Sequence, residues 1–176
     1  LVAGRHFPGD VPAADIGWKA LAVNLSDLAA MGAHADWFQL ALTLPSADAH
    51  WLAEFSQGLF AAADAYGVQL IGGDTTSGPL AITIQAAGNL ATGSAITRRG
   101  AQPGDQIWLS GAVGGGALGL QQWNEGKRSG AAIEQLNRPL PQLLLGQALV
   151  GVATAAIDVS DGLLQDLSHI LKASRV

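Results

Sequence analysis

The chain has 176 residues, of which 49% are apolar and 13% are charged, and this composition suits one medium or two small globular domains with a buried core. It has no cysteine, which excludes disulfides and thiolate sites within the sequence and agrees with the cytoplasmic location that we expect. A formal net charge of −5, with only nine Lys and Arg residues, argues against a nucleic-acid-binding surface or an anionic-membrane surface.

The first part of the sequence alternates between helical and strand patterns. A helix is predicted over residues 12–31, because Leu21, Leu25 and Leu28 recur at helical spacing. The same criteria predict, in chain order, a strand at 37–44, a helix at 47–66, a strand at 68–71 and a return strand at 80–90. The predicted order is therefore αβαββ.

A change of composition marks the predicted boundary between two domains. Residues 91–104 carry Gly, Ser, Thr, Arg and Pro with little apolar content, so we divide the chain into residues 1–93 and 94–176. The second unit is predicted to contain, in order, a strand at 106–109, a glycine turn at 111–116, helices at 117–123, 131–136 and 141–149, a strand at 155–157 and a last helix after residue 162. The longest apolar stretch, residues 143–157, is shorter than the about 20 residues that span a bilayer, so no transmembrane helix is predicted.

A glycine-rich motif precedes the first predicted helix of the second unit. Gly114 to Gly119 matches the G-x-G-x-x-G pattern of a dinucleotide-binding turn. The next predicted strand, however, lies beyond the about 30 residues of a compact βαβ unit, and glycine-rich sequences often match this pattern by chance. The dinucleotide site is therefore the less favoured interpretation.

The stretch from Leu70 to Pro79 presents one acidic side chain, Asp74, among glycines and hydroxyl residues. We expect Gly72 and Gly73 to form a turn whose backbone approaches an anion closely. Asp74 would repel that anion unless a cation lay between them, so the stretch predicts a metal ion together with a phosphate. The alternative is an ordinary hairpin with a turn-forming aspartate.

Three further aspartates also lack a basic partner nearby in the sequence. Asp27 lies beside the apolar stripe of the first predicted helix, and Asp158 and Asp161 lie between a predicted strand and a helix. Carboxylates without basic neighbours suit magnesium, which is bound by a few carboxylates together with water and phosphate. The alternatives are a solvated helix surface for Asp27 and helix N-capping by Ser160 or Asp161. The joint occurrence of these acids favours a metal-phosphate site.

Other catalytic signals are few. The four histidines show no pair at metal-ligand spacing, and no G-x-S-x-G motif supports a serine nucleophile. Among the histidines, only His6 is kept as a candidate site residue.

Four motifs together resemble the thiamine-monophosphate kinase family, of the superfamily that includes aminoimidazole-ribonucleotide synthetase and selenophosphate synthetase. They are Val2-x-Gly4-x-His6-Phe7, the stretch from Ala14 to Gly32 that contains Asn24-Leu25-Ser26-Asp27, Gly72-Gly73-Asp74-Thr75-Thr76, and Asp158-Val159-Ser160-Asp161-Gly162-Leu163. The resemblance implies ATP-dependent phosphorylation of thiamine monophosphate to thiamine diphosphate, with several magnesium ions. It also implies a two-domain α/β (α+β) fold like that of aminoimidazole-ribonucleotide synthetase, in which the N-terminal domain forms a homodimer through its sheet and the site lies between the domains.

The resemblance assigns expected roles to individual residues. The expected magnesium ligands are Asp27, Asp74, Asp158 and Asp161. The expected ATP contacts are Gly73, Asp74, Arg98 and Ser160. His6 is expected to contact the phosphate of the thiamine substrate, and no residue is expected to act as a general base.

The sequence also departs from the family pattern. We expect it to be truncated at both ends, because the family's acidic segment ahead of Val2 and its aromatic C-terminal segment are absent. Gly115 stands where the family has Asp, and Trp18 where His is frequent. Two alternatives stay open, namely another ATP-dependent enzyme of the superfamily, such as a purine-intermediate synthetase or a selenophosphate synthetase, and a non-catalytic nucleotide-binding module.

Overall fold

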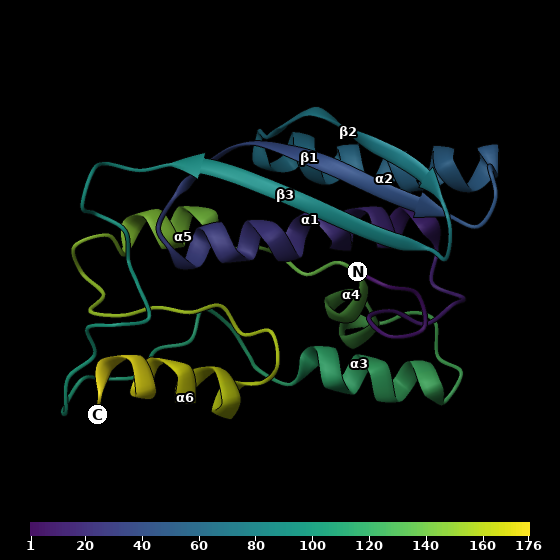
Figure 1. Ribbon diagram of the computed structural model, residues 1–176. Coiled ribbons are helices and arrows are strands. Elements are labelled where there is room, and N and C mark those ends of the chain that lie inside the picture. Colours follow the sequence, from purple (N-terminus) through teal and green to yellow (C-terminus); the bar gives the residue numbers. More distant parts are fainter.

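A three-stranded sheet packs against two long helices, and four shorter helices lie beside this layered part of the molecule (Figure 1). The computed structural model describes all residues from Leu1 to Val176. The elements are α1 (Ala13–Ala30), β1 (His34–Leu44), α2 (Ala49–Tyr66), β2 (Gln69–Ser77), β3 (Ala81–Asn89), α3 (Gly115–Asn124), α4 (Ala131–Asn137), α5 (Leu143–Ala148) and α6 (Leu163–Ser174). The helices predicted at 12–31 and 47–66 and the strand predicted at 37–44 are confirmed.

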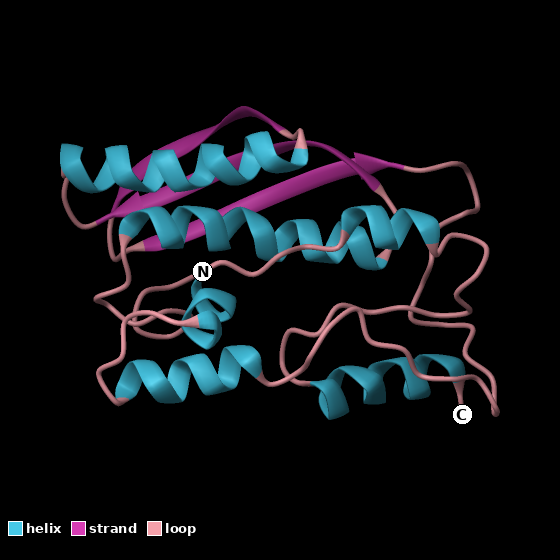
Figure 2. Ribbon diagram, turned by 180° about the vertical axis from the view of Figure 1, so that it is seen from behind, coloured by secondary structure: helices cyan, strands magenta, loops and turns pink.

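The sheet has the strand order β2-β1-β3, with β1 parallel to β2 and antiparallel to β3. Helices α1 and α2 lie on one side of it (Figure 2), and the buried side chains of Phe38, Leu42 and Ile82 fill the space between sheet and helices. Side chains alternate between the two faces of a strand, so Ala41 and Thr83, which are exposed, lie on the opposite face. No helix of this chain covers that face.

The predicted hairpin between residues 68 and 90 is wrong, because β2 and β3 lie on opposite sides of β1 and do not pair with each other. The glycine-rich stretch is not a turn either, since β2 continues through Gly73 and Asp74. Gly73 has a φ of 154°, and a Cβ at this position would overlap the carbonyl oxygen of Leu40 in β1. Gly73 therefore permits close approach of two strands beside an irregularity in their register.

Glycines also bring α1 and α2 together. A Cβ on Gly17 would overlap the carbonyl oxygen of Phe55, and a Cβ on Gly58 would overlap that of Ala14. The two helix backbones therefore touch directly, and this contact places α1 firmly under the sheet.

Two strands predicted in the second unit do not form. Residues 106–109 and 155–157 are apolar, but neither stretch is a strand, and Ile107 and Trp108 are 67% and 83% exposed. A strand needs a neighbouring strand to satisfy its backbone hydrogen bonds, and neither stretch is part of a strand ladder, because the bond from Ala156 N to Thr97 O does not extend into one. The strand that should precede the glycine-rich motif of α3 is therefore missing, and with it the structural context of a dinucleotide-binding turn.

The second half of the chain packs directly on the first. Helix α5 lies against the end of α1, where the backbones of Gly146 and Ala29 touch. Trp123, Ile133 and Leu143 belong to the same buried apolar cluster as the residues between the sheet and α1. The domain division at residue 93 stays a prediction. None of the helices has both the length and the apolar character needed to cross a membrane.

Candidate functional site

The carboxyl group of Asp158 lies close enough to that of Asp27 to raise its pKa. Asp27 is near the end of α1, and Asp158 is in the loop that precedes α6. Partial burial raises the pKa of Asp27, the nearby carboxylate of Asp158 raises it further, and the charge of Arg98 opposes this rise. Two adjacent acids create a local excess of negative charge, which a bound cation would relieve.

A buried aspartate, Asp166, holds the loop that carries Asp158. It is 4% exposed, and its Oδ2 accepts hydrogen bonds from the backbone N–H groups of Ser160, Asp161 and Gly162 at 2.9, 3.1 and 3.2 Å. These three bonds draw the backbone of the loop inward. Our sequence analysis did not name Asp166, although its signal was an acidic residue in the first turn of a helix, where a side chain can satisfy free N–H groups.

The other predicted residues of this loop are exposed at its surface. Ser160 Oγ donates a hydrogen bond to Asp158 Oδ2 at 2.7 Å, and Gln165 Nε2 donates to Asp161 Oδ2 at 3.3 Å. Ser160 therefore orients the carboxylate of Asp158. Asp161 lies in the same loop, three residues further along the chain.

Arg98 belongs to a segment that is tied to the same region. Its carbonyl oxygen accepts a hydrogen bond from Ser174 Oγ at 3.2 Å, and that hydroxyl oxygen accepts from the N–H groups of Gly100 and Ala101, each at 3.1 Å. The backbone of Thr97 accepts a hydrogen bond from Ala156 N at 3.1 Å. These contacts fix the exposed Arg98 beside the loop of Asp158.

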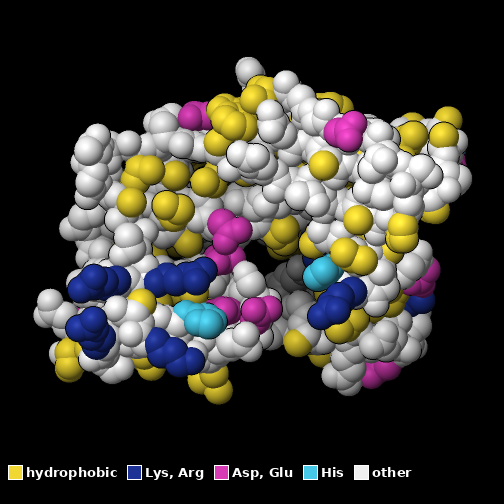
Figure 3. Space-filling view, in the orientation of Figure 1, with side chains coloured by type: hydrophobic (Ala, Val, Ile, Leu, Met, Phe, Trp, Pro, Cys, Tyr) yellow, Lys and Arg dark blue, Asp and Glu magenta, His cyan; other side chains and the backbone are white.

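The surface is hollowed between its two lower parts, with acidic side chains along one side of the hollow and a histidine beside a basic side chain on the other (Figure 3). His6 lies in the exposed loop before α1, where its Nδ1 accepts a hydrogen bond from Val2 N at 2.8 Å. Lys19 Nζ donates to the carbonyl oxygen of His6 at 3.5 Å, and burial lowers the pKa of Lys19.

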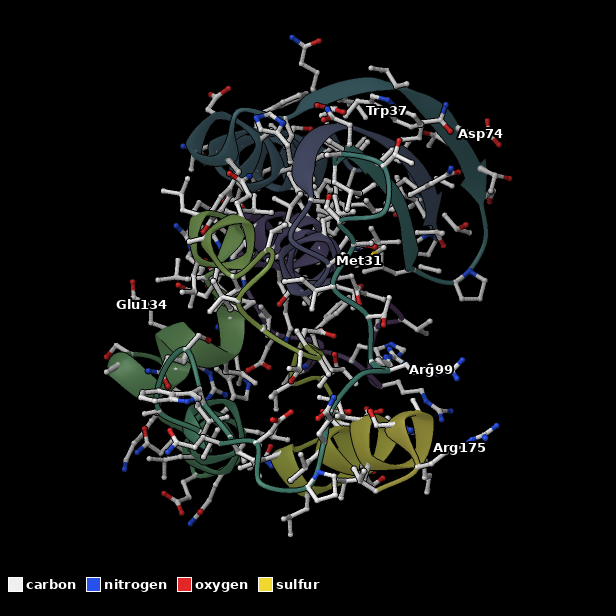
Figure 4. The ribbon with its side chains drawn as sticks, turned by 90° about the vertical axis from the view of Figure 1, so that its left-hand side faces the viewer. Met31, Trp37, Asp74, Arg99, Glu134 and Arg175 are labelled. Carbon is white, nitrogen blue, oxygen red and sulfur yellow. The ribbon has the colours of Figure 1, made fainter.

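The structure does not bring Asp74 to the other acids within one chain. Asp74 pairs with Ala41 in the sheet and lies on the face that points away from the helices (Figure 4). Asp27 lies on α1, next to Asp158. No group of three or more His, Asp or Glu side chains is close enough to hold a metal ion, so the predicted set of four aspartates is not assembled in a single chain.

The residues that do meet still suit a hard divalent cation. Asp27 and Asp158 offer carboxylate oxygens, and like charge raises the pKa of Asp27. Two adjacent carboxylates repel each other unless a cation balances their charge. Magnesium prefers a small number of carboxylates, with water and phosphate as its remaining ligands.

Comparisons with known proteins identify the family of this chain. Residues 1–90 match the family model "AIR synthase related protein, N-terminal domain". Over 99% of its length the chain is 52% identical to thiamine-monophosphate kinase from Escherichia coli strain K12, and it spans 55% of that protein. The chain thus covers only about half the length of such curated relatives.

Solved structures give the same result. The thiamine-monophosphate kinase from Stenotrophomonas maltophilia K279a superposes with a TM-score of 0.96 at 48% identity, over all of this chain and 59% of that one. A structure of AaThiL complexed with AMPPCP and TMP has a TM-score of 0.92 at 29% identity, over 98% of this chain and 58% of that one. The predicted fold class is confirmed, and so is the resemblance stated from the motifs. The chain therefore belongs to the AIR synthase related protein family, and it is similar to the thiamine-monophosphate kinases along its whole length.

Proposed function

We propose that this chain is the larger part of an ATP-dependent kinase that converts thiamine monophosphate to thiamine diphosphate. The observation that carries the proposal is the pairing of Asp27 with Asp158 beside Arg98. The similarity to thiamine-monophosphate kinases and to a structure complexed with AMPPCP and TMP supports the choice of substrates. This similarity does not favour a purine-intermediate synthetase, a selenophosphate synthetase or a non-catalytic module.

Each candidate residue has a role in this proposal. Asp27, Asp158 and Asp161, together with Asp74, would hold magnesium, which when bound neutralises charge between the donor and acceptor phosphates. Arg98, Ser160 and the backbone of Gly73 would contact ATP. His6 would contact the phosphate of thiamine monophosphate from the other side of the hollow.

The chemistry explains why acids outnumber bases at the site. A phosphate monoester has a second pKa of about 6, so it is mostly ionised at neutral pH and needs no general base. One of its oxygens forms a bond to the γ-phosphorus of ATP, the bond from that phosphorus to the β–γ bridging oxygen breaks, and ADP leaves. The protein then has to position two polyanions and balance their charge.

Asp74 leads us to propose a homodimer formed through the uncovered face of the sheet. Asp74 lies on that face, whereas Asp27 lies on α1, which packs against the opposite face of the sheet (Figure 2). Asp74 would then serve the site of the second copy.

A cytoplasmic location agrees with the lack of cysteine.

Subunit complementation tests the role of Asp74. Full-length Asp74→Asn and Asp158→Asn proteins should each be inactive as homodimers. A mixed dimer isolated with two affinity tags should regain one intact site, which is about half of the wild-type activity per dimer if the two sites work independently. An inactive mixed dimer would show that Asp74 serves the site of its own chain.

The activity itself is tested with the full-length protein. ADP release should require thiamine monophosphate and magnesium, and thiamine diphosphate should form in equal amount. Thiamine and purine-pathway substrates should give no release. Equal turnover with another acceptor, or ATP binding without turnover, would refute the proposed function.

A further inference from the structure

Asp10, Trp123 and Arg128 join the loop that carries His6 to the end of α3, and we call this contact the Asp10 clamp. Trp123 Nε1 donates a hydrogen bond to Asp10 Oδ1 at 2.9 Å, and Arg128 donates to Oδ2 at 2.7 Å. The Arg128 guanidinium also lies over the Trp123 ring, 4.3 Å from its centroid, and donates to the Trp123 carbonyl oxygen at 2.8 Å. Both carboxylate oxygens of Asp10 are thus bound by the second half of the chain.

The clamp is built on buried packing. Trp123 is 4% exposed and lies in the same apolar cluster as Phe7 and Val11, which flank Asp10 in the sequence. The hydrogen bond from Trp123 lowers the pKa of Asp10, and Arg128 lowers it further. Asp10 therefore stays charged at neutral pH, and its hydrogen bonds are charge-assisted.

A second contact of the same chemical kind lies nearby. Arg138 Nε donates to Asp15 Oδ1 at 2.5 Å, and Trp18 Nε1 donates to the carbonyl oxygen of Pro139 at 3.0 Å. This contact fixes the start of α1 to the chain after α4. This contact does not involve the loop before α1, so other contacts hold that loop.

The loop of residues 2–7 is held by several contacts, among them the bond from Lys19 Nζ to the carbonyl oxygen of His6 and the buried side chain of Phe7. At one end Ala3 N donates to Leu80 O at 3.2 Å, which ties the loop to the sheet. At the other end, beyond Phe7, the chain reaches the Asp10 clamp. The Asp10 clamp therefore ties the end of the His6 loop to the end of α3, while Lys19 holds His6 to α1.

We propose that Asp10, Trp123 and Arg128 are positioning residues, which hold the His6 loop at a fixed place between α1 and the end of α3. They act through His6 and touch neither substrate. The inference rests on the proposed function, in which His6 contacts the phosphate of the acceptor. The clamp would then govern binding of a phosphate monoester and leave binding of ATP unchanged.

Kinetics of the full-length protein test the proposal. Arg128→Ala and Asp10→Asn should raise the KM for thiamine monophosphate about tenfold, as expected when a charge-assisted contact is lost, with the Kd of ATP unchanged. Arg128→Lys should recover part of the loss. The matched control is Lys127→Ala, because Lys127 pairs only with Glu125, at 3.8 Å, and makes no contact with the loop. Unchanged acceptor KM in both clamp variants, or an equal loss of ATP affinity, would overturn the proposal.

Hydrogen exchange separates this inference from the proposed function. The N–H groups of Gly4 and His6 are bonded inside the loop at 3.0 Å each, so they should exchange faster in Arg128→Ala and at the wild-type rate in Lys127→Ala. If the wild-type protein does not phosphorylate thiamine monophosphate, the proposed function is refuted, and exchange alone decides whether the clamp holds the loop. Wild-type exchange in Arg128→Ala would refute the clamp.

Discussion

The Cα of Gly58 in α2 lies directly against the carbonyl oxygen of Ala14 in α1, with no space for a Cβ between them. Gly58→Ala should therefore push the two helices apart and lower the free energy of unfolding by about 3 kcal/mol, as overpacked cores do. Urea unfolding of the full-length protein measures this change. Gly116→Ala is the control, because this position in α3 has open space around it and alanine favours the helix by about 1 kcal/mol. Equal behaviour of the two variants would contradict direct backbone contact.

The pairing of Asp27 with Asp158 predicts opposite effects of one substitution with and without magnesium. Asp158→Asn removes a like charge from beside Asp27, so the melting temperature without divalent ions should rise. The stabilisation that magnesium gives to the wild-type protein should shrink in this variant, because one carboxylate ligand is lost. Thermal melting at several magnesium concentrations measures both effects. Asp64→Asn, on the exposed side of α2, should change neither.

The buried Asp166 predicts a defect in the loop of residues 158–162. Asp166→Ala would leave three backbone N–H groups without their acceptor, at a cost of about 1–3 kcal/mol for each group that stays buried. We expect weaker binding of magnesium-ATP, measured by calorimetry, because the loop loses its fixed shape. Ser168→Ala, which removes an exposed hydroxyl from the same helix, is the control. Wild-type ATP affinity in Asp166→Ala would show that Asp166 has only a local structural role.

Asp10 predicts a pH dependence of stability. Its pKa in the folded protein is lowered, first by the hydrogen bond from Trp123, so the unfolded chain binds more protons than the folded chain at acidic pH. The stabilisation is therefore complete above the unfolded pKa of about 4 and is lost as the pH falls through the lower folded value. The difference in melting temperature between wild type and Asp10→Asn should be constant at neutral pH and shrink below about pH 4.

Asp105 independently tests whether an aspartate with a lowered pKa loses its stabilising effect at low pH. The Thr154 hydroxyl and the N–H of Gln102 donate to Asp105, and these bonds lower its pKa. The difference in melting temperature between wild type and Asp105→Asn should therefore shrink over the same acidic range. For either variant, a stability difference that widens at low pH would show that the pKa of that aspartate is not lowered in the folded protein.

The sequence alone predicted the elements whose signals are local. The spacing of Leu21, Leu25 and Leu28 predicts the first helix because a 3.6-residue repeat places them on one side, and all three belong to or pack against the core. Asp27 and Asp158 stood out because acids beside apolar residues without a basic partner are unusual. The motifs around these acids were enough to state the family resemblance.

Tertiary structure decided what depends on distant pairing. The stretch of Gly72, Gly73 and Asp74 has the composition of a turn, yet it becomes a strand because β1 offers a partner along its whole length. Residues 106–109 have the composition of a strand and do not form one, because no partner lies beside them. Strand formation is decided by backbone bonds between segments far apart in the sequence, and local composition does not contain that information.

The candidate site likewise depends on contacts between segments that are far apart in the sequence. That Asp27 meets Asp158 follows from the docking of the α6 loop against α1, and that Asp74 lies on the far face of the sheet follows from its register with Ala41. Asp166 and the Asp10 clamp were not predicted, because each aspartate is recognised by N–H groups that come from elsewhere in the folded chain. Only the folded chain brings those donors to the carboxylates.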